Sequence, residues 1–165
     1  MQERDVTPGN MPDSRDPEAL VRQFHTTYGL PIVEGEPTVD YDRVHMRMSL
    51  ILEEVTELVT AVYGKEAGKV LAEGAAAAQA ADDGERDLIE TADALADLVY
   101  VIYGMALESG ISLPAVLKEV QASNMSKLGE DGKPIYREDG KVLKGPGFFP
   151  PNIARALKAD INGLS

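Results

Sequence analysis

The sequence predicts an all-α protein, a four- to five-helix bundle with a small C-terminal β-hairpin. Hydrophobic residues recur at three- and four-residue steps over several long segments, which is the period of an amphipathic helix. Strand and helix patterns do not alternate along the chain, and no internal repeat is present. Of the 165 residues, 44% are hydrophobic and 27% charged, as in a folded domain. We predict one domain over residues 16–165, preceded by a flexible polar tail over 1–15.

Two helices are predicted in the first half of the chain. The first spans 16–28, because Asp16 can cap a helix with a proline in its first turn, and Gly29 follows its last hydrophobic residue. The second spans 40–63, where hydrophobic residues keep helical steps. The Ala-rich segment 64–86 comes next, and its composition fits either a helical extension or a mobile loop.

The second half is predicted to hold two long helices, a hairpin and a short last helix. The segment 87–109 is the most hydrophobic in the chain, and 112–125 begins with a serine cap followed by a proline. The Asp139-Gly140 dipeptide then separates two short extended runs, which predicts a tight type I′ turn. The stretch "IARALKADI", 153–161, is expected to form the last helix.

Net charge and composition exclude several classes of function. The formal net charge is -12, so nucleic acid and anionic membranes would repel the chain. The sequence contains no cysteine, which excludes disulfides, thiolate metal sites and cysteine nucleophiles. The first residues lack the hydrophobic core of a signal peptide, and no hydrophobic run approaches the ~18 residues of a membrane span. We therefore expect a cytoplasmic protein with no nucleic-acid or membrane partner.

Two of the predicted helices carry closely spaced acids. These are Glu53, Glu54 and Glu57 in "LILEEVTEL", and Glu90, Asp93 and Asp97 in "IETADALAD". On the first helix Glu53 and Glu57 lie roughly opposite the hydrophobic stripe, which is also the pattern of a solvated face. On the second helix the acids share one narrow sector and the other faces are hydrophobic, so we expect that helix to be buried. Carboxylates in line on a buried helix are costly unless a cation meets them, which favours a bound metal.

The type of ligand indicates which metal. Carboxylate oxygens alone suit hard cations, Mg²⁺ or Mn²⁺ before Zn²⁺ or Fe²⁺. A di-iron bundle uses Glu-x-x-His pairs, and neither His25 nor His45 lies three residues after a glutamate. A Mg²⁺ site with open positions is a common means of gripping a polyphosphate. A redox bundle would require histidine or a different ligand spacing.

The acidic motifs carry a resemblance to a known family. "EEVTEL" followed by "ETAD" is similar to the Glu-Glu-x-x-Glu and Glu-x-x-Asp signature of the MazG-like all-α nucleoside triphosphate pyrophosphohydrolases, which include dimeric dUTPases and phosphoribosyl-ATP pyrophosphohydrolase. "FHTTYGLPI" and "SNMSKLGEDGKPIYREDGKVLKGPGFFPP" also resemble this superfamily, so the likeness covers about 21–152. The gap between the two acidic motifs is longer here than is usual in the family.

The resemblance implies roles for individual acids. Glu54 and Glu57 match the metal-binding pair of the first motif helix, and the pair Glu90 and Asp93 matches that of the second. Glu53 matches the acid proposed to orient or deprotonate the attacking water. Asp97 would support the metal site as an outer ligand. The implied reaction is Mg²⁺-dependent hydrolysis between the α and β phosphates, with Mn²⁺ as a possible substitute, in an oligomer that is a homodimer or a dimer of dimers.

Cations are concentrated near the C-terminus. Residues 118–145 carry six basic and five acidic residues, whereas the rest of the chain carries ten basic and twenty-three acidic ones. Lysines can hold the phosphates of a nucleotide, and the resemblance places the segment beginning at Asn124 close to them. The predicted substrate-binding residues are Asn124, Lys127, Lys144 and Lys141.

The sequence says least about the nucleobase. Phe24, His25, Tyr28 and Tyr100 are aromatic candidates for a nucleoside pocket, although such residues are more often part of a core. dUTP is the leading substrate by likeness to dimeric dUTPases, and a house-cleaning role on dCTP or damaged nucleotides follows closely. The alternative is an acidic all-α interaction or regulatory protein without catalysis.

Overall fold

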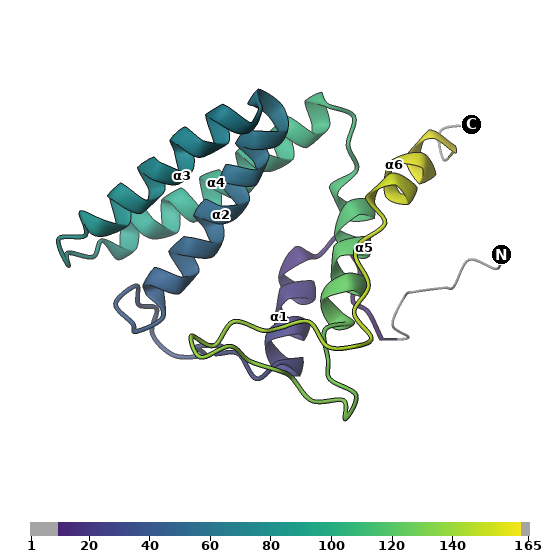
Figure 1. The fold of residues 1–165 in the computed structure, drawn as a ribbon, viewed down its shortest axis with the longest axis horizontal. Helices are drawn as coiled ribbons and strands as arrows, with labels where there is room; N and C mark the ends of the chain where they lie inside the picture. The colour runs from purple at the N-terminus through teal and green to yellow at the C-terminus, as the bar shows by residue number, and fades with distance from the viewer. Residues whose placement is uncertain (1–9, 163–165) are drawn as a thin grey trace. The chain divides into compact units, whose positions relative to one another are not determined.

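The computed structural model describes residues 10–162, and this range is helical apart from its connections. Six helices follow one another in this part of the chain: α1 (Pro17–Thr27), α2 (Val44–Tyr63), α3 (Lys65–Ala80), α4 (Leu88–Glu108), α5 (Leu113–Met125) and α6 (Ile153–Asn162) (Figure 1). The prediction of an all-α fold is confirmed. The segment 64–86, which composition left open, supplies α3. Of the predicted tail, residues 1–9 lie outside the described residues.

The helices belong to two compact units. Met1–Glu34 and Asp97–Ser165, in their described parts, make up the first unit, and Gly35–Ala96 makes up the second. The first unit therefore contains α1, α5, α6 and the second half of α4, whereas the second contains α2, α3 and the first half of α4. The acids of the first motif lie in the second unit. The prediction of one domain over 16–165 stays a prediction.

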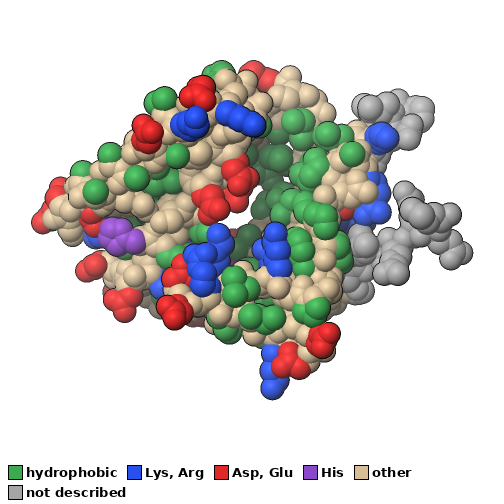
Figure 2. Space-filling model, viewed as in Figure 1, with side chains coloured by type: hydrophobic (Ala, Val, Ile, Leu, Met, Phe, Trp, Pro, Cys, Tyr) green, Lys and Arg blue, Asp and Glu red, His purple; other side chains and the backbone are tan. Residues whose placement is uncertain are grey.

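A close approach of two helices builds the second unit. Gly64, with a φ of 97°, ends α2 and lets the chain turn into α3, and the two helices then pack along each other (Figure 1). A Cβ on Gly68 would lie 2.0 Å from Oγ1 of Thr60, so only glycine fits at this contact. Hydrophobic side chains nevertheless remain exposed on this hairpin (Figure 2). Val70 on α3 is one of them, at 70% exposure.

The core of the first unit surrounds Tyr28. This side chain is fully buried, and Leu20, Ala122 and Ala156 are buried with it. The Tyr28 hydroxyl donates a hydrogen bond to the backbone carbonyl of Asn124 at 2.7 Å, which ties the end of α1 to the end of α5. Burial raises the pKa of the Tyr28 hydroxyl above its ordinary value, so it is a donor at all physiological pH values.

The predicted β-hairpin is wrong. In residues 10–162 the region holds one antiparallel bridge, between Tyr136 and Val142, and no strand. The amide of Gly140 donates to the carbonyl of Arg137 at 2.9 Å, and glycines are the only described residues with positive φ. Asp139 therefore does not have the positive φ that a type I′ turn requires, and the loop is a type I turn followed by a left-handed glycine. The pairing does not extend because the next backbone groups have other partners. The amide of Lys133 donates to Oδ1 of Asp131 at 3.0 Å and its carbonyl accepts from the amide of Gly129 at 2.8 Å, while the amide of Gly145 donates to the carbonyl of Lys127.

The prediction that the helix around 87–109 is buried is also wrong in the single chain. Only Ala106 of α4 is buried. Large hydrophobic side chains along it are exposed, including Leu95 at 48%, Val99 at 55% and Leu107 at 79%. Hydrophobicity on every face indicates that a helix is covered, and nothing in the pattern says whether the cover comes from the same chain.

No single helix within 10–162 is long and hydrophobic enough to cross a membrane, and only the bent pair α4 and α5 meets the length and composition test jointly.

Candidate active site

The first acidic set lies on the exposed side of α2. Glu53, Glu54 and Glu57 are exposed, whereas Leu52 and Val55, on the opposite side, are partly covered. Glu54 and Glu57 are three residues apart, so their carboxylates are neighbours on the helix surface. The structure thus confirms the face that the helical period predicts, and it leaves these acids accessible to a ligand from solvent.

The second acidic set begins in the first turn of α4. The amide of Glu90 donates to Oδ1 of Asp87 at 3.0 Å, and the hydroxyl of Thr91 donates to the carbonyl of the same Asp87 at 2.5 Å. Asp87 thus caps α4 and fixes where Glu90 stands. The free amides of a helix N-terminus favour negative charge, which helps the first turn to carry the Glu90 carboxylate, whereas Asp93 lies in the second turn. Both are exposed.

The two acidic pairs stay apart in the described part of the chain. No group of three or more His, Cys, Asp or Glu side chains is close enough there to hold one metal ion. Mg²⁺ is commonly held by one or two carboxylates together with water and substrate phosphates. Each pair, Glu54 with Glu57 or Glu90 with Asp93, therefore meets that requirement in number and in donor chemistry. The assignment of these residues as metal ligands stays a prediction.

The predicted phosphate-binding residues lie in the first unit, together with Asp97. The amide of Gly145 donates to the carbonyl of Lys127 at 2.9 Å, which brings the segment after Lys144 back to the end of α5. Lys127 Nζ lies 5.8 Å from the centre of the Phe24 ring, and Lys144 Nζ lies 4.5 Å from the centre of the Phe148 ring.

Lys141 lies apart from these contacts, in the turn that replaces the hairpin. Its amide donates to Oδ1 of Asp139 at 3.1 Å, and its carbonyl accepts from the amide of Arg137 at 2.8 Å. The Arg137 guanidinium beside Asp139 holds the pKa of that carboxyl at about 2. Of the four predicted phosphate ligands, backbone contacts therefore gather the segments of Asn124, Lys127 and Lys144, and Lys141 sits in a separate loop.

Sequence reasoning missed the hydrogen bonds that hold these segments. Ser123 and Ser126 both contact the backbone of Phe149, at 2.8 Å and 3.1 Å, and so fix the chain after the loop to α5. The hydroxyl of Tyr136 donates to the carbonyl of Tyr28. Because Tyr28 is fully buried, its ring cannot stack on a nucleobase. The signal for these roles was weak, since a serine or tyrosine in a helix has many possible partners.

The comparisons with known proteins agree with the acidic motifs. The family model for phosphoribosyl-ATP pyrophosphohydrolase matches residues 21–124, which include all six acids and Asn124 but none of the three lysines. A crystal structure from Exiguobacterium sp. 255-15, provisionally described as an NTP pyrophosphohydrolase, is 30% identical, with 94% of this chain and 97% of that chain covered and a TM-score of 0.65. Among curated proteins none matches significantly. The resemblance seen in the motifs is thereby confirmed, and the chain belongs to the phosphoribosyl-ATP pyrophosphohydrolase family.

Proposed function

We propose that this protein is a Mg²⁺-dependent nucleoside triphosphate pyrophosphohydrolase, which cleaves between the α and β phosphates to give a nucleoside monophosphate and pyrophosphate. One observation carries the proposal: two exposed carboxylate pairs, Glu54 with Glu57 and Glu90 with Asp93, stand within the segment that matches the family. Exposed acids alone would be a solvated surface. In a pyrophosphohydrolase family, acids with this spacing on two helices would be accessible so that they can bind a metal and a substrate.

The acids divide the work of hydrolysis. Water attacks the α phosphorus, the bond to the bridging oxygen breaks, and pyrophosphate leaves. Glu53 accepts the proton of that water, and general-base help of this kind contributes about 10²–10⁴ in rate. Each of the two carboxylate pairs would hold Mg²⁺, and Asp97 would support them as an outer ligand. When bound, Mg²⁺, or Mn²⁺ in its place, neutralises the triphosphate and lowers the pKa of the water.

Basic residues complete the substrate site. A triphosphate brings about four negative charges to a chain whose formal net charge is already -12, so local cations are needed to hold it. Lys127 and Lys144 provide them, with Asn124 as a neutral donor between α5 and the phosphates and Lys141 as a further contact. A lysine near phosphates acts as a movable point charge, which suits a substrate that is split during the reaction.

dUTP is the leading substrate, with dCTP or damaged deoxynucleotides next, and the biological role is house-cleaning of the nucleotide pool. The preference rests on the likeness to dimeric dUTPases alone. The family match adds phosphoribosyl-ATP to the compounds worth testing.

The working form is a homodimer or a dimer of dimers. Exposed Leu95, Val99 and Leu107 on α4 support this, because an accessible hydrophobic stripe of this kind marks a contact surface. A second copy is the partner proposed to cover it.

A panel of substrates tests the activity. The full chain is incubated with Mg²⁺ and each deoxynucleoside triphosphate or phosphoribosyl-ATP, and the products are resolved by chromatography. We expect pyrophosphate and a monophosphate. Orthophosphate with a diphosphate would contradict the cleavage site, and no turnover of any substrate would favour an acidic interaction protein.

A single substitution tests the metal assignment. Glu54→Gln keeps the size of the side chain but removes its charge, so Mg²⁺-dependent turnover should be lost while the circular dichroism of the helices is unchanged. Glu73→Gln on the exposed side of α3 is the matched control and should keep full activity. Normal turnover by Glu54→Gln would show that this carboxylate does not hold the metal.

A further inference from the structure

The segment 145–149 lies against the end of α5 at two points, and we call it the Gly145 turn. At its start the amide of Gly145 donates to the carbonyl of Lys127 at 2.9 Å. The carbonyl of Gly145 accepts from the amide of Phe148 at 3.1 Å, which closes the turn. At its end the backbone of Phe149 contacts two serine hydroxyls at the end of α5, at 2.8 Å and 3.1 Å. The turn is therefore fixed at both ends.

No side chain fits at Gly145. A Cβ at this position would lie 2.1 Å from the carbonyl oxygen of Leu128 and 2.9 Å from that of Lys127. Both oxygens belong to the backbone, so they cannot rotate aside as the end of a long side chain does. Gly145 is not among the described glycines that have a positive φ. Glycine is thus needed here for the close approach of two backbones, and its freedom of φ plays no part.

This close approach sets the backbones of two lysines side by side. Lys144 directly precedes Gly145, whose amide is bonded to the carbonyl of Lys127. Lys144 Nζ lies 4.5 Å from the centre of the Phe148 ring, within the same turn. Lys127 Nζ lies 5.8 Å from the centre of the Phe24 ring. An aromatic face attracts an ammonium group without neutralising it, so the rings orient the lysines and leave their positive charge in place.

The charges of the surrounding segment favour an anion. Among the five acids within 118–145, Glu119 accepts hydrogen bonds from the Arg155 guanidinium at 2.8 Å and 3.0 Å. Asp139 accepts one from Nε of Arg137 at 2.9 Å. The segment is left with five lysines against three other acids. Its local charge is therefore positive in a chain whose net charge is -12, and a local field of this sign concentrates anions.

We propose that Gly145 is a positioning residue of the phosphate site, which sets Lys144 beside Lys127 so that both ammonium groups grip one polyphosphate. The inference deepens the proposed function and rests on it. Neighbouring phosphates of a triphosphate each carry negative charge, and a lysine acts on them as a compact point charge on a flexible stem. Two lysines that start from a fixed spacing hold such a chain of phosphates better than either alone, because the second contact is made within one complex.

A matched pair of glycines tests the positioning. Gly147 lies in the same turn, has no positive φ and would have nothing within 4 Å of a Cβ, so Gly147→Ala is the control for Gly145→Ala. Tripolyphosphate is titrated into each full-length protein by calorimetry, with EDTA present so that the carboxylates hold no metal. Gly145→Ala should weaken binding about tenfold or more, as the loss of one charged hydrogen bond does. Gly147→Ala should stay within about twofold of the wild type.

Equal affinities of the two alanine variants would overturn the inference. A wild-type protein that does not bind tripolyphosphate would overturn it as well.

A second background separates positioning from a general loss of structure. If Gly145 acts through Lys144, Gly145→Ala should cost little further affinity in a protein that already carries Lys144→Gln, because both changes remove the same contact. A merely structural role would give the same loss in both backgrounds and would refute the proposal. Lys133→Gln, on an exposed lysine of the same loop, is the control for charge and should leave the effect of Gly145→Ala complete.

The two lysines keep the inference testable should Gly145→Ala not fold. Lys127→Gln and Lys144→Gln should each weaken tripolyphosphate binding. The double variant should lose less binding free energy than the sum of the two single losses, because both lysines grip one anion. Losses that add would contradict a shared site.

The active enzyme distinguishes failure of this inference from failure of the proposed function. Gly145→Ala should raise KM for the triphosphate, with kcat less changed, because it weakens substrate binding. Tripolyphosphate binding that depends on Gly145, without turnover of any substrate, would retain the site and remove the proposed function. Turnover with equal KM for Gly145→Ala and Gly147→Ala would remove the inference alone.

Discussion

The carboxylate of Glu53 and those of Glu54 and Glu57 have separate proposed roles although they stand on one exposed helix face. In the proposed mechanism Glu54 and Glu57 would hold a metal, and Glu53 would accept a proton. These roles differ in what a substitution changes. Loss of a metal ligand changes how activity depends on Mg²⁺, and loss of a base lowers the rate of the chemical step.

Glu53→Gln should lower kcat by about 10²–10⁴ and leave KM nearly unchanged, because a general base acts in the transition state and adds little to substrate binding. The Mg²⁺ concentration needed for half-maximal rate should stay as in the wild type. Steady-state kinetics over a Mg²⁺ series measures both quantities. A rise in the required Mg²⁺ would instead identify Glu53 as a ligand.

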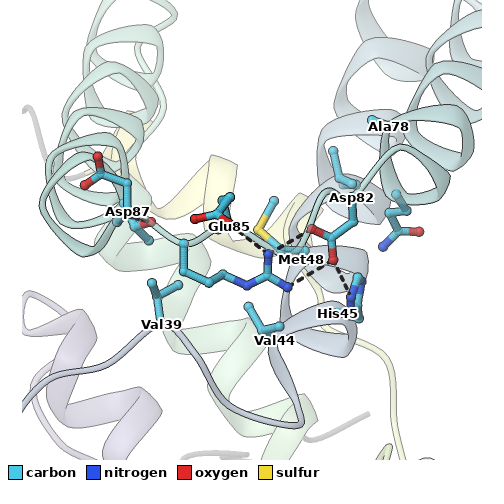
Figure 3. Close-up of a pocket in the computed structure, with 12 residues that line it drawn as sticks. Val39, Val44, His45, Met48, Ala78, Asp82, Glu85 and Asp87 are labelled. Atoms are coloured by element: carbon cyan, nitrogen blue, oxygen red, sulfur yellow. Dashed lines mark hydrogen bonds and ion pairs between the residues drawn. The ribbon is translucent and has the colours of Figure 1, made fainter.

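The lowered pKa of Asp82, which pairs with Arg86 (Figure 3), predicts how the stability of the second unit changes at low pH. Its pKa is lowered in the folded state by Arg86, so its contribution to stability is complete above its ordinary pKa of about 4 and is lost as pH falls below that value toward the folded pKa. Asp82→Asn should therefore be less stable than the wild type at pH 7, with a difference that shrinks below about pH 4. Denaturation with urea from pH 7 to pH 3 measures this difference. If the difference in free energy of unfolding between the two proteins does not change with pH, the ion pair of Asp82 with Arg86 does not contribute to stability.

At the scale of elements, α3 is the part of the fold that composition left open. It packs along α2, and the two helices approach each other closely where Gly68 meets Thr60. Alanine-rich sequence favours a helix. The position of this helix along α2, however, depends on Gly68, because the absence of a side chain there allows the close approach to Thr60.

Two glycine substitutions in α3 distinguish the effect of helix propensity on stability from the effect of packing against α2. Gly68→Ala should lower the free energy of unfolding by about 1–2 kcal/mol, because overpacking outweighs the gain in helix propensity. Gly74 has open space around its Cα position, so Gly74→Ala should raise the free energy of unfolding by about 0.5–1 kcal/mol. Urea denaturation of both variants measures the difference. Stabilisation by Gly68→Ala would show that the two helices separate easily.

At the scale of the whole molecule, α4 is the helix that meets a second copy in the proposed assembly. Its hydrophobic side chains are exposed in the single chain, which corrects the prediction of a buried helix. A charge placed in a contact surface is costly, and the same charge on a free surface is not.

Val99→Glu should shift the protein from dimer to monomer, as measured by light scattering coupled to size-exclusion chromatography. Val70→Glu provides the control, because Val70 is also exposed, at 70%, but lies on α3. It should leave the mass unchanged. A wild-type protein that is monomeric at all concentrations would contradict the proposed assembly.

Local patterns determined much of this protein from the sequence alone. Asp16 and Ser112 cap α1 and α5 as predicted, with hydrogen bonds to the amides of Ala19 and Ala115. Helical period also placed Glu53 and Glu57 on the exposed face of α2. Caps and faces are set by neighbours within one or two turns, so a single sequence contains the information.

Only the tertiary structure decided which distant segments meet. The hairpin failed because the backbone groups of Lys133 and Gly145, which would continue the ladder, bond to Gly129, Asp131 and Lys127 instead. The contact of His45 with Asp82 and the packing of Gly68 on Thr60 join residues of separate segments, which no local pattern encodes. The sequence determined the helices and the acids they expose, and long-range packing decided the surfaces between them, because burial depends on partners that a periodic pattern cannot identify.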